Sequence, residues 1–591
     1  MDMLKTLLGQ VREYKKDSLL TPLFTALEVL MEVLIPFVTA AIIDQGIEEG
    51  NMQSVYAYGA LMLVMAFLSL VFGALAGRYA ARAASGFAAN LREGLYASVQ
   101  AFSFSNIDKY STAGLVTRMT TDVTNLQNAW QMILRIAVRA PLMLILSMAM
   151  CFFISAELSA VFLAAIVVLA VVLIVIMLAT MKLFACVFQT YDDLNGSVQE
   201  NVSAIRVVKA FVREDYEKGK FRKAAEKLYK LFMKAEGILA LNNPVMMLVV
   251  YGCIIALSWL GARQIVLGSL TTGELTSLFS YVMSVLMSLM MLSTIFVMIT
   301  MSAASGRRVA EVLEETPALA NPKQPRTTVA DGRIDFDHVY FSYGQGSGGE
   351  ALRDIDIHIR PGETIGVIGG TGSGKSTLAN LICRLYDVDA GSVRVGGVDV
   401  RAYDMETLRT QVAVVPQNNV LFSGTVLENL RWGREDATDA ECREACRLAC
   451  ADDFVTRLPQ GYESRIERGG SNLSGGQRQR LCIARALLKR PKILILDDST
   501  SAVDTATDAR IRANLASAIP GATRIIIAQR VSSVQDAGRI LVLDNGSVNG
   551  FDSHENLLKH NRIYQEIYAA QTQGGGDFDH AAESGKEGGQ E

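Results

Sequence analysis

The sequence predicts an all-α domain of six membrane-spanning helices followed by an α/β domain. Six apolar stretches in the first half of the 591-residue chain exceed the roughly 18 residues that a helix needs to cross a bilayer. From about residue 333 onward, short β-rich runs alternate with helical patterns instead. These two observations exclude a soluble enzyme, a disordered chain and a secreted disulfide scaffold.

The overall charge is nearly balanced, with 56 Lys and Arg against 60 Asp and Glu, and half of the residues are hydrophobic. Nucleic-acid-binding proteins are usually basic, so we expect no nucleic-acid partner. The expected surroundings of the first domain are membrane lipid. The eight cysteines are scattered through membrane and polar segments, which favours reduced thiols over a disulfide framework.

The six expected membrane helices are joined by connections that are alternately short and long. The polar stretch 1–17 before them predicts an amphipathic helix on the membrane surface, and residues 18–310 form the predicted membrane domain. The expected spans are approximately Ser18–Ile43, Ser54–Gly77, Ile136–Ser155, Leu158–Met181, Pro244–Leu267 and Leu275–Met301.

Basic residues gather in the two long connections, at about 78–135 and 182–243, whereas the short loops hold mostly acids. The excess of cytoplasmic positive charge in membrane proteins therefore places the long connections, both termini and the α/β domain in the cytoplasm. We expect a multi-pass protein of the cytoplasmic membrane. The long connections carry helical patterns, so the membrane helices are expected to continue beyond the bilayer. Basic residues of the first connection and its end are Arg78, Arg82, Arg92, Lys109, Arg118, Arg135 and Arg139.

A linker at 311–332 separates the two domains, because Pro317, Pro322 and Pro325 cannot continue a helix. The α/β domain is assigned to residues 333–572. The remaining residues, 573–591, are Gly-rich and acidic, which is typical of a disordered tail.

The strongest motif follows a strand-like run and precedes a helix-like run, the context required of a phosphate-binding P-loop. Glycines let backbone N–H groups surround a phosphate, and the helix start adds positive potential. Lys375 is expected to reach the β- and γ-phosphates, and Ser376 to reach Mg²⁺. The motif comprises Gly369, Gly370, Thr371, Gly372, Ser373, Gly374, Lys375, Ser376 and Thr377.

A second run of four apolar residues, 493–496, ends in Asp497 and Asp498. A buried strand that delivers Asp497 to Mg²⁺ explains this pattern. Many strands end in Asp, so this run alone is weak evidence for a Mg²⁺ site, and the interpretation depends on the presence of the P-loop.

Between these motifs lies Leu473-Ser474-Gly475-Gly476-Gln477. Here the chain resembles the ATP-binding-cassette (ABC) family, whose signature this pentapeptide is, and the fold implied is a P-loop NTPase of the ABC type. Its hydroxyl and glycine amides form another phosphate nest. The resemblance implies ATP and Mg²⁺ as cofactors, and a dimer in which the signature closes over the ATP held by the partner.

Other positions of the family follow in order. Tyr343 resembles the aromatic residue that stacks on adenine, and Gln417 the glutamine that senses Mg²⁺ and water. Ser501 and Asp504 resemble the loop that crosses to the partner. With six helices before one cassette, the chain resembles an ABC exporter half, in which short coupling helices at the tips of the long connections press on the cassettes.

Two departures from the family pattern lie where the γ-phosphate is expected. The residue after the Mg²⁺ aspartate is usually Glu but here is Asp498, and the usual switch histidine is Gln529. Asp is one methylene shorter, and misplacement by about 1 Å can cost about 10²-fold in rate. Gln can donate a hydrogen bond but cannot become a cation. A third departure, Arg468 where the family has Glu, precedes the signature.

These losses, with the signature intact, resemble the degenerate-site subunit of heterodimeric bacterial multidrug exporters. The implied partner is a different half-transporter with the consensus Glu and His. The implied activity is ATP-driven export of a small hydrophobic or amphipathic molecule. A homodimeric exporter with slow hydrolysis at Asp498, an ATP-gated channel or regulator, and an importer on the same scaffold remain open.

Glu28 and Glu32 lie one turn apart inside the first apolar stretch. Intramembrane acids are candidates for substrate contact, and a cationic substrate would suit them. The alternative is that they face a water-filled cavity or pack without meeting substrate. Methionines of the sixth stretch could form an adaptable apolar wall, or simply pack.

Overall fold

The structure is a computed structural model that describes residues 2–344, 349–499 and 502–573. The chain divides into two compact units. The first consists of Met1–Gln100 and Ser111–Glu315, and the second of Ala101–Tyr110 and Thr316–Glu591. Of the expected tail, residues 574–591 lie outside the described part.

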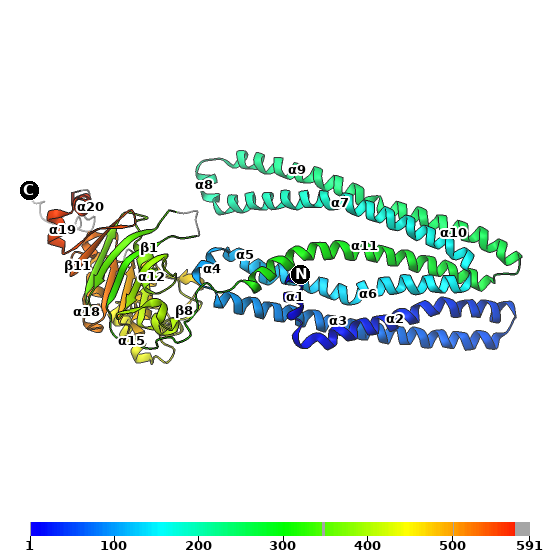
Figure 1. The fold of residues 1–591 in the computed structure, drawn as a ribbon, viewed down its shortest axis with the longest axis horizontal. Helices are drawn as coiled ribbons and strands as arrows, with labels where there is room; N and C mark the ends of the chain where they lie inside the picture. The colour runs from blue at the N-terminus through cyan, green and yellow to red at the C-terminus, as the bar shows by residue number, and fades with distance from the viewer. Residues whose placement is uncertain (1, 345–348, 500–501, 574–591) are drawn as a thin grey trace, which may run out of the picture. The chain divides into compact units, whose positions relative to one another are not determined.

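The first unit is helical, and within the described residues six helical stretches are long and apolar enough to cross a membrane, which confirms that expectation. Several helices continue well past the apolar stretch, as expected of the long connections. The main helices (Figure 1) are α1 (Asp2–Gly9), α2 (Lys15–Ile42), α3 (Met52–Ala101), α5 (Thr112–Thr117), α6 (Val123–Ile154), α7 (Ala156–Ser203), α8 (Ile205–Ala210), α9 (Glu214–Ala240), α10 (Asn242–Val266) and α11 (Thr272–Glu314).

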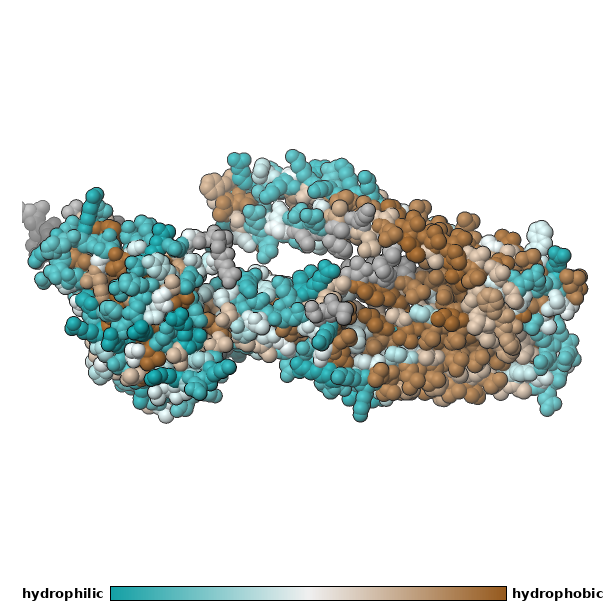
Figure 2. All heavy atoms as spheres, in the orientation of Figure 1, coloured by the Kyte–Doolittle hydropathy of each residue, from teal (hydrophilic) through white to brown (hydrophobic). Residues whose placement is uncertain are grey.

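On the face of the helical unit drawn in Figure 2, an apolar belt gives way to polar surface on both sides along the helices. Helix α11 packs against α6 and α2, and α2 packs against α6. Val29 and Val33 of α2 are buried with Tyr281 of α11, and the Tyr281 hydroxyl donates to the Val33 carbonyl over 2.7 Å. Satisfying such polar groups internally is obligatory at bilayer depth.

The second unit contains a six-stranded sheet in the order β12-β11-β3-β10-β9-β6, parallel except for β12. Helix α12 (Lys375–Ile382) follows β3, and the helices α13 (Met405–Gln411), α14 (Val426–Arg431), α15 (Asp439–Leu448), α16 (Asp452–Val455), α17 (Gly475–Leu488), α18 (Thr505–Ala518), α19 (His554–His560) and α20 (Arg562–Gln573) complete the unit. The strands of this sheet are β3 (Thr364–Gly369), β6 (Val412–Val415), β9 (Ile493–Asp497), β10 (Thr523–Ile527), β11 (Arg539–Asp544) and β12 (Ser547–Asp552).

A four-stranded antiparallel sheet, β2-β1-β4-β5, packs beside it through a shared apolar core. Its strands are β1 (Ile334–Phe341), β2 (Leu352–Ile359), β4 (Ala390–Val395) and β5 (Val398–Asp399). A short pair, β7 (Gly424–Thr425) and β8 (Arg465–Ile466), stands apart. The expected combination of a six-helix membrane domain and an α/β domain is confirmed.

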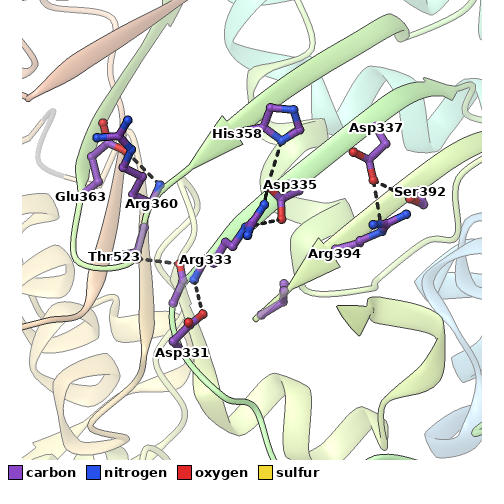
Figure 3. A network of polar contacts seen from close by, with 12 residues as sticks. Asp331, Arg333, Asp335, Asp337, His358, Arg360, Glu363, Ser392, Arg394 and Thr523 are labelled. Carbon is purple, nitrogen blue, oxygen red and sulfur yellow. Dashed lines mark hydrogen bonds and ion pairs between the residues drawn. The ribbon is translucent and has the colours of Figure 1, made fainter. Parts of the chain in front are cut away.

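Charged side chains tie the strands of the antiparallel sheet together (Figure 3). Asp335 of β1 is buried and accepts from Arg333, and it lies 2.8 Å from Nδ1 of His358 on β2. Asp337 pairs with Arg394 of β4 over 3.1 Å. Cross-strand pairs of this kind stabilise the pairing of neighbouring strands.

Candidate nucleotide-binding site

The P-loop, Asp497, Asp498, Gln417 and Gln529 lie together at one edge of the six-stranded sheet. The strands β3, β10, β9 and β6 are parallel neighbours, so their carboxyl ends meet there. The P-loop follows β3, Asp497 ends β9, Gln529 lies two residues beyond β10, and Gln417 lies two residues beyond β6. Crevices outside the carboxyl ends of such sheets are where α/β proteins bind nucleotides.

The P-loop makes a tight turn between β3 and α12 that only glycine tolerates at two points. Gly372 and Gly374 have φ of 81° and 95°, and a Cβ at Gly374 would meet the Leu352 side chain at 2.5 Å. Lys375 begins α12, and its ammonium donates to the carbonyls of Gly369 and Gly370 over 2.9 and 2.7 Å. Burial lowers the pKa of Lys375, partly opposed by Asp497 and Asp498. A phosphate in this loop would give the ammonium a charged partner.

Asp497 and Ser376 are placed together, as a Mg²⁺ site requires. Asp497 is buried at the end of β9, and the Ser376 side chain is close enough to stabilise its charged form. Burial raises the pKa of Asp497, while Ser376 and Lys375 oppose the rise. A carboxylate beside a hydroxyl is an oxygen ligand pair of the kind Mg²⁺ uses with nucleotide phosphates.

The three residues predicted to be catalytic converge on one oxygen atom. The amides of Gln417 and Gln529 donate to Oδ2 of Asp498 over 3.3 and 3.1 Å. Asp498 has a φ of 47°, uncommon for a residue with a side chain, and its N–H donates to the Ile527 carbonyl over 2.8 Å. Burial raises its pKa. Two neutral amides, and no imidazole, therefore surround this carboxylate among its described hydrogen bonds.

Tyr343 lies beside the P-loop helix. Its hydroxyl donates to Thr377 over 3.2 Å and accepts from Asn380 over 3.2 Å, while 41% of the residue is exposed. The Tyr386 ring packs edge-on against it at 5.2 Å between centroids. An exposed ring held by its hydroxyl presents a face on which a base can stack.

The signature residues start helix α17. Ser474 caps this helix, accepting from the Gln477 N–H over 3.3 Å, and the Gln477 side chain accepts from the Ser474 N–H over 2.9 Å. The Ser474 hydroxyl proton stays available for a further acceptor. A Cβ on Gly476 would meet the Ala502 carbonyl at 2.7 Å, so this glycine is required by the chain's own packing. Leu473 is buried. Within the described residues, no hydrogen bond of these side chains reaches the P-loop.

The loop predicted to cross to a partner is described only in part. Ser501 lies outside the described residues. Asp504 caps α18 by accepting from the Thr507 N–H over 2.9 Å. Ala502 donates its N–H to Gln479 of α17 over 3.1 Å, so the loop is anchored to the signature helix.

The short helix α4 (Phe104–Asp108), at the tip of the first long connection, packs within the cassette unit. The Tyr386 hydroxyl donates to Asp108 over 2.7 Å, and Asn106 donates to the Thr316 carbonyl over 2.9 Å. The Phe104 and Tyr386 rings lie 6.1 Å apart. The aromatic residue beside Tyr343 thus also contacts this helix.

In the helical unit, Glu28 and Glu32 share one cation. Arg139 donates to Glu28 over 2.6 Å and to both oxygens of Glu32 over 2.8 and 2.7 Å. Arg135, one turn earlier on α6, lies 4.0 Å from Glu28.

Sequence reasoning missed several of these contacts. Arg135 and Arg139 were counted only as part of the basic connection, although their spacing of four matches that of the two acids. That matched spacing was the available signal. Nothing in the sequence pointed to Asn380 or Tyr386.

A membrane-embedded helical domain joined to a P-loop cassette with an intact signature defines the class of half-transporters. The ABC transporter transmembrane region matches residues 19–290, and the ABC transporter ATP-binding domain matches residues 352–501. The uncharacterized ABC transporter ATP-binding protein YfiB of Bacillus subtilis is 36% identical over 547 residues, covering 92% of this chain and 94% of the relative. The chain belongs to the ABC transporter family.

Two further similarities extend along most of the chain. The fatty acid ABC transporter ATP-binding/permease protein of Mycobacterium bovis is 31% identical over 480 residues, covering 81% of this chain and 76% of the relative. The structure of a bacterial Atm1-family ABC exporter with ATP bound superposes with a TM-score of 0.81 at 25% identity, covering 94% of this chain and 99% of that one. The fold is therefore that of an ABC exporter half.

Proposed function

We propose that this chain is one half of a heterodimeric ABC exporter, that it moves a small hydrophobic or amphipathic molecule out across the cytoplasmic membrane, and that its own ATP site hydrolyses poorly. ATP closes the two cassettes on each other, and the membrane halves then open outward. Hydrolysis occurs mainly on the partner's P-loop, with this chain's signature completing that site. The similarity to a transporter named for fatty acids supports an amphipathic substrate.

The main support for a poorly hydrolysing ATP site on this chain is the environment of Asp498. The Asp498 side chain is one methylene shorter than that of the usual Glu. The side-chain amides of Gln417 and Gln529 both donate hydrogen bonds to the same oxygen of its carboxylate. A general base must reach the attacking water at hydrogen-bond distance, and a shift of about 1 Å costs about 10²-fold in rate. Gln529 can donate to a γ-phosphate oxygen but adds no positive charge. The residues expected to bind the phosphates and Mg²⁺, namely Lys375, Ser376 and Asp497, are all present.

Helix α8 supports the need for a second chain. Val207, Phe211 and Val212, in and after this helix, are 57%, 73% and 80% exposed in the helical unit. Apolar side chains this exposed favour a protein contact. We assign the contact to the partner's cassette, with α8 acting as the second coupling helix.

ATP turnover by the chain alone is the direct test. We expect the purified chain to bind MgATP and to hydrolyse it well below the ~1 s⁻¹ at the lower end of ordinary enzyme rates. Turnover at ordinary rates without a partner would refute the degenerate site and favour a homodimer.

Flux measured in sealed inverted vesicles that contain the complex tests the direction. ATP-dependent uphill uptake of an amphipathic dye into these vesicles is the expected result, since their interior corresponds to the outside. Downhill flux would indicate an ATP-gated channel, and ATP-driven transport in the opposite direction would indicate an importer.

A further inference from the structure

A cavity of about 650 Å³ lies in the helical unit between α2, α6 and α11. This volume falls within the range of small-molecule sites in proteins. Its lining includes the apolar side chains of Met132, Ile136 and Met298 and the polar side chains of Gln131 and Arg135. A molecule with one apolar and one polar end could contact both kinds of side chain.

Glu28, which lines the cavity, and Glu32, one turn further along α2, are already paired with one arginine. Arg139 donates to Glu28 over 2.6 Å and binds both oxygens of Glu32. These bonds are charge-assisted and use three of the five N–H donors of the guanidinium, so both carboxylates have a strong partner. A cationic ligand would have to compete with Arg139 for the same oxygens.

Arg135 is in the opposite situation. Its nearest carboxylate oxygen is Oε1 of Glu28, at 4.0 Å, and that oxygen already accepts from Arg139. Within the described residues, Arg135 makes no closer polar contact. Its side chain is 38% exposed, against 9% for Glu28, whose second oxygen is buried without a partner and is therefore not presented to the cavity. Of the three charged side chains that line the cavity, Arg135 is the most exposed, at 38% against 23% for Arg139 and 9% for Glu28.

We propose that Arg135 binds the carboxylate head of an amphipathic organic acid, and that Met132, Ile136 and Met298 contact its apolar chain. This assignment rests on the proposed function, since it names the substrate class of the same exporter. Arginine presents two parallel N–H donors that match a carboxylate, and a weakly hydrated guanidinium is favoured over an ammonium in such sites. The intramembrane acids then serve to hold Arg139 and shape the wall.

The test is equilibrium binding, without ATP, to the full chain in lipid nanodiscs. The probes are 11-(dansylamino)undecanoic acid, its methyl ester and the corresponding terminal amine, which share one chain and differ in head charge. We expect the acid to bind more tightly than both. Arg135→Gln should weaken binding of the acid by about tenfold or more and leave the ester unchanged. Arg135→Lys should lose less, because it keeps the charge.

Two further variants make the result specific. Arg263→Gln removes an exposed arginine of α10 that does not line the cavity, and it should change nothing. Glu28→Gln removes the acid nearest to Arg135 and should strengthen binding of the acid probe. If Glu28→Gln and Arg135→Gln weaken it equally, Arg135 is a structural counterion and the proposal is wrong.

Tighter binding of the amine or the ester than of the acid would also overturn the proposal. This outcome differs from failure of the proposed function. Acid binding through Arg135 without ATP-driven flux would refute export and keep the site, whereas flux of other molecules with no acid binding would refute the site and keep export.

Discussion

Gly475→Glu places a carboxylate at the first position of the signature helix, where the proposed pairing of two cassettes would put the γ-phosphate of the ATP bound by the partner. The change should be tolerated by the fold. A Cβ at this position would meet the Ala502 Cβ at 3.3 Å, which needs a shift of a few tenths of an ångström. An acid in the first turn of a helix is favourable by about 0.3–1 kcal/mol. The Ser474 cap stays in place.

We therefore expect the substitution to destabilise the ATP-bound dimer of cassettes and not the fold of this chain. Like charges brought together in a water-poor interface cost several kcal/mol, and about 3 kcal/mol corresponds to about a hundredfold loss. We expect Gly475→Glu to reduce ATP turnover and vesicle transport of the complex by about this factor. Gly475→Gln has nearly the same size and no charge, so it separates repulsion from crowding and should retain more activity.

Asp498→Asn is the decisive comparison, measured with the partner present. If this chain carries the degenerate site, removing the Asp498 charge should reduce turnover far less than Gly475→Glu does. If Asp498→Asn is the more damaging change, hydrolysis takes place on this chain's own P-loop and the reasoning above is refuted.

Four other outcomes are expected. Lys375→Ala should weaken nucleotide binding by this chain while the complex keeps part of its turnover, because in the proposed heterodimer the lysine of the hydrolysing site belongs to the partner. Complete loss of turnover would show that the two sites are more symmetric or more tightly coupled. Asp498→Glu combined with Gln529→His should raise turnover of the complex modestly, measured by phosphate release. Arg139→Gln leaves two intramembrane glutamates without their cation and should lower the free energy of unfolding by up to about 3 kcal/mol, seen as a lower Tm in detergent. Burial raises the pKa of Asp497, so protons compete with Mg²⁺ at higher pH than at an ordinary aspartate. As the pH is lowered, Mg²⁺-dependent nucleotide binding should therefore weaken at a higher pH than an ordinary aspartate would give, and binding measured without Mg²⁺ provides the control.

Local sequence was enough to predict the two fold classes and the phosphate-binding loop. A long apolar run in a bilayer is expected to form a helix, because a helix pairs the backbone N–H and C=O groups of a single segment with one another where no water is present. The glycines of the P-loop report a backbone shape directly, and Gly372 and Gly374 do adopt positive φ. The apolar run ending in Asp497 likewise predicts its own strand, β9.

The hydrogen-bond partners of Asp498 could not be predicted from local sequence patterns. Gln417, Asp498 and Gln529 follow three different strands, and their meeting at one oxygen depends on the order β10-β9-β6. Strand order is set by how the helices between the strands pack on the sheet, which no single segment encodes. The family resemblance identified these three residues as site candidates, and the structure showed that they are hydrogen-bonded to one another.

The intramembrane charges divide in the same way. The sequence by itself placed two acids one turn apart in an apolar stretch, which suggested a site for a cation. Only the tertiary structure decided that Arg139 holds both acids, whereas Arg135 faces the cavity. Arg139 on α6 is 111 residues from Glu28 and 107 residues from Glu32 on α2 in the chain, and the rotation of these helices about their own axes is fixed by packing among α2, α6 and α11. That rotation determines which charge is neutralised within the protein and which remains exposed to a ligand.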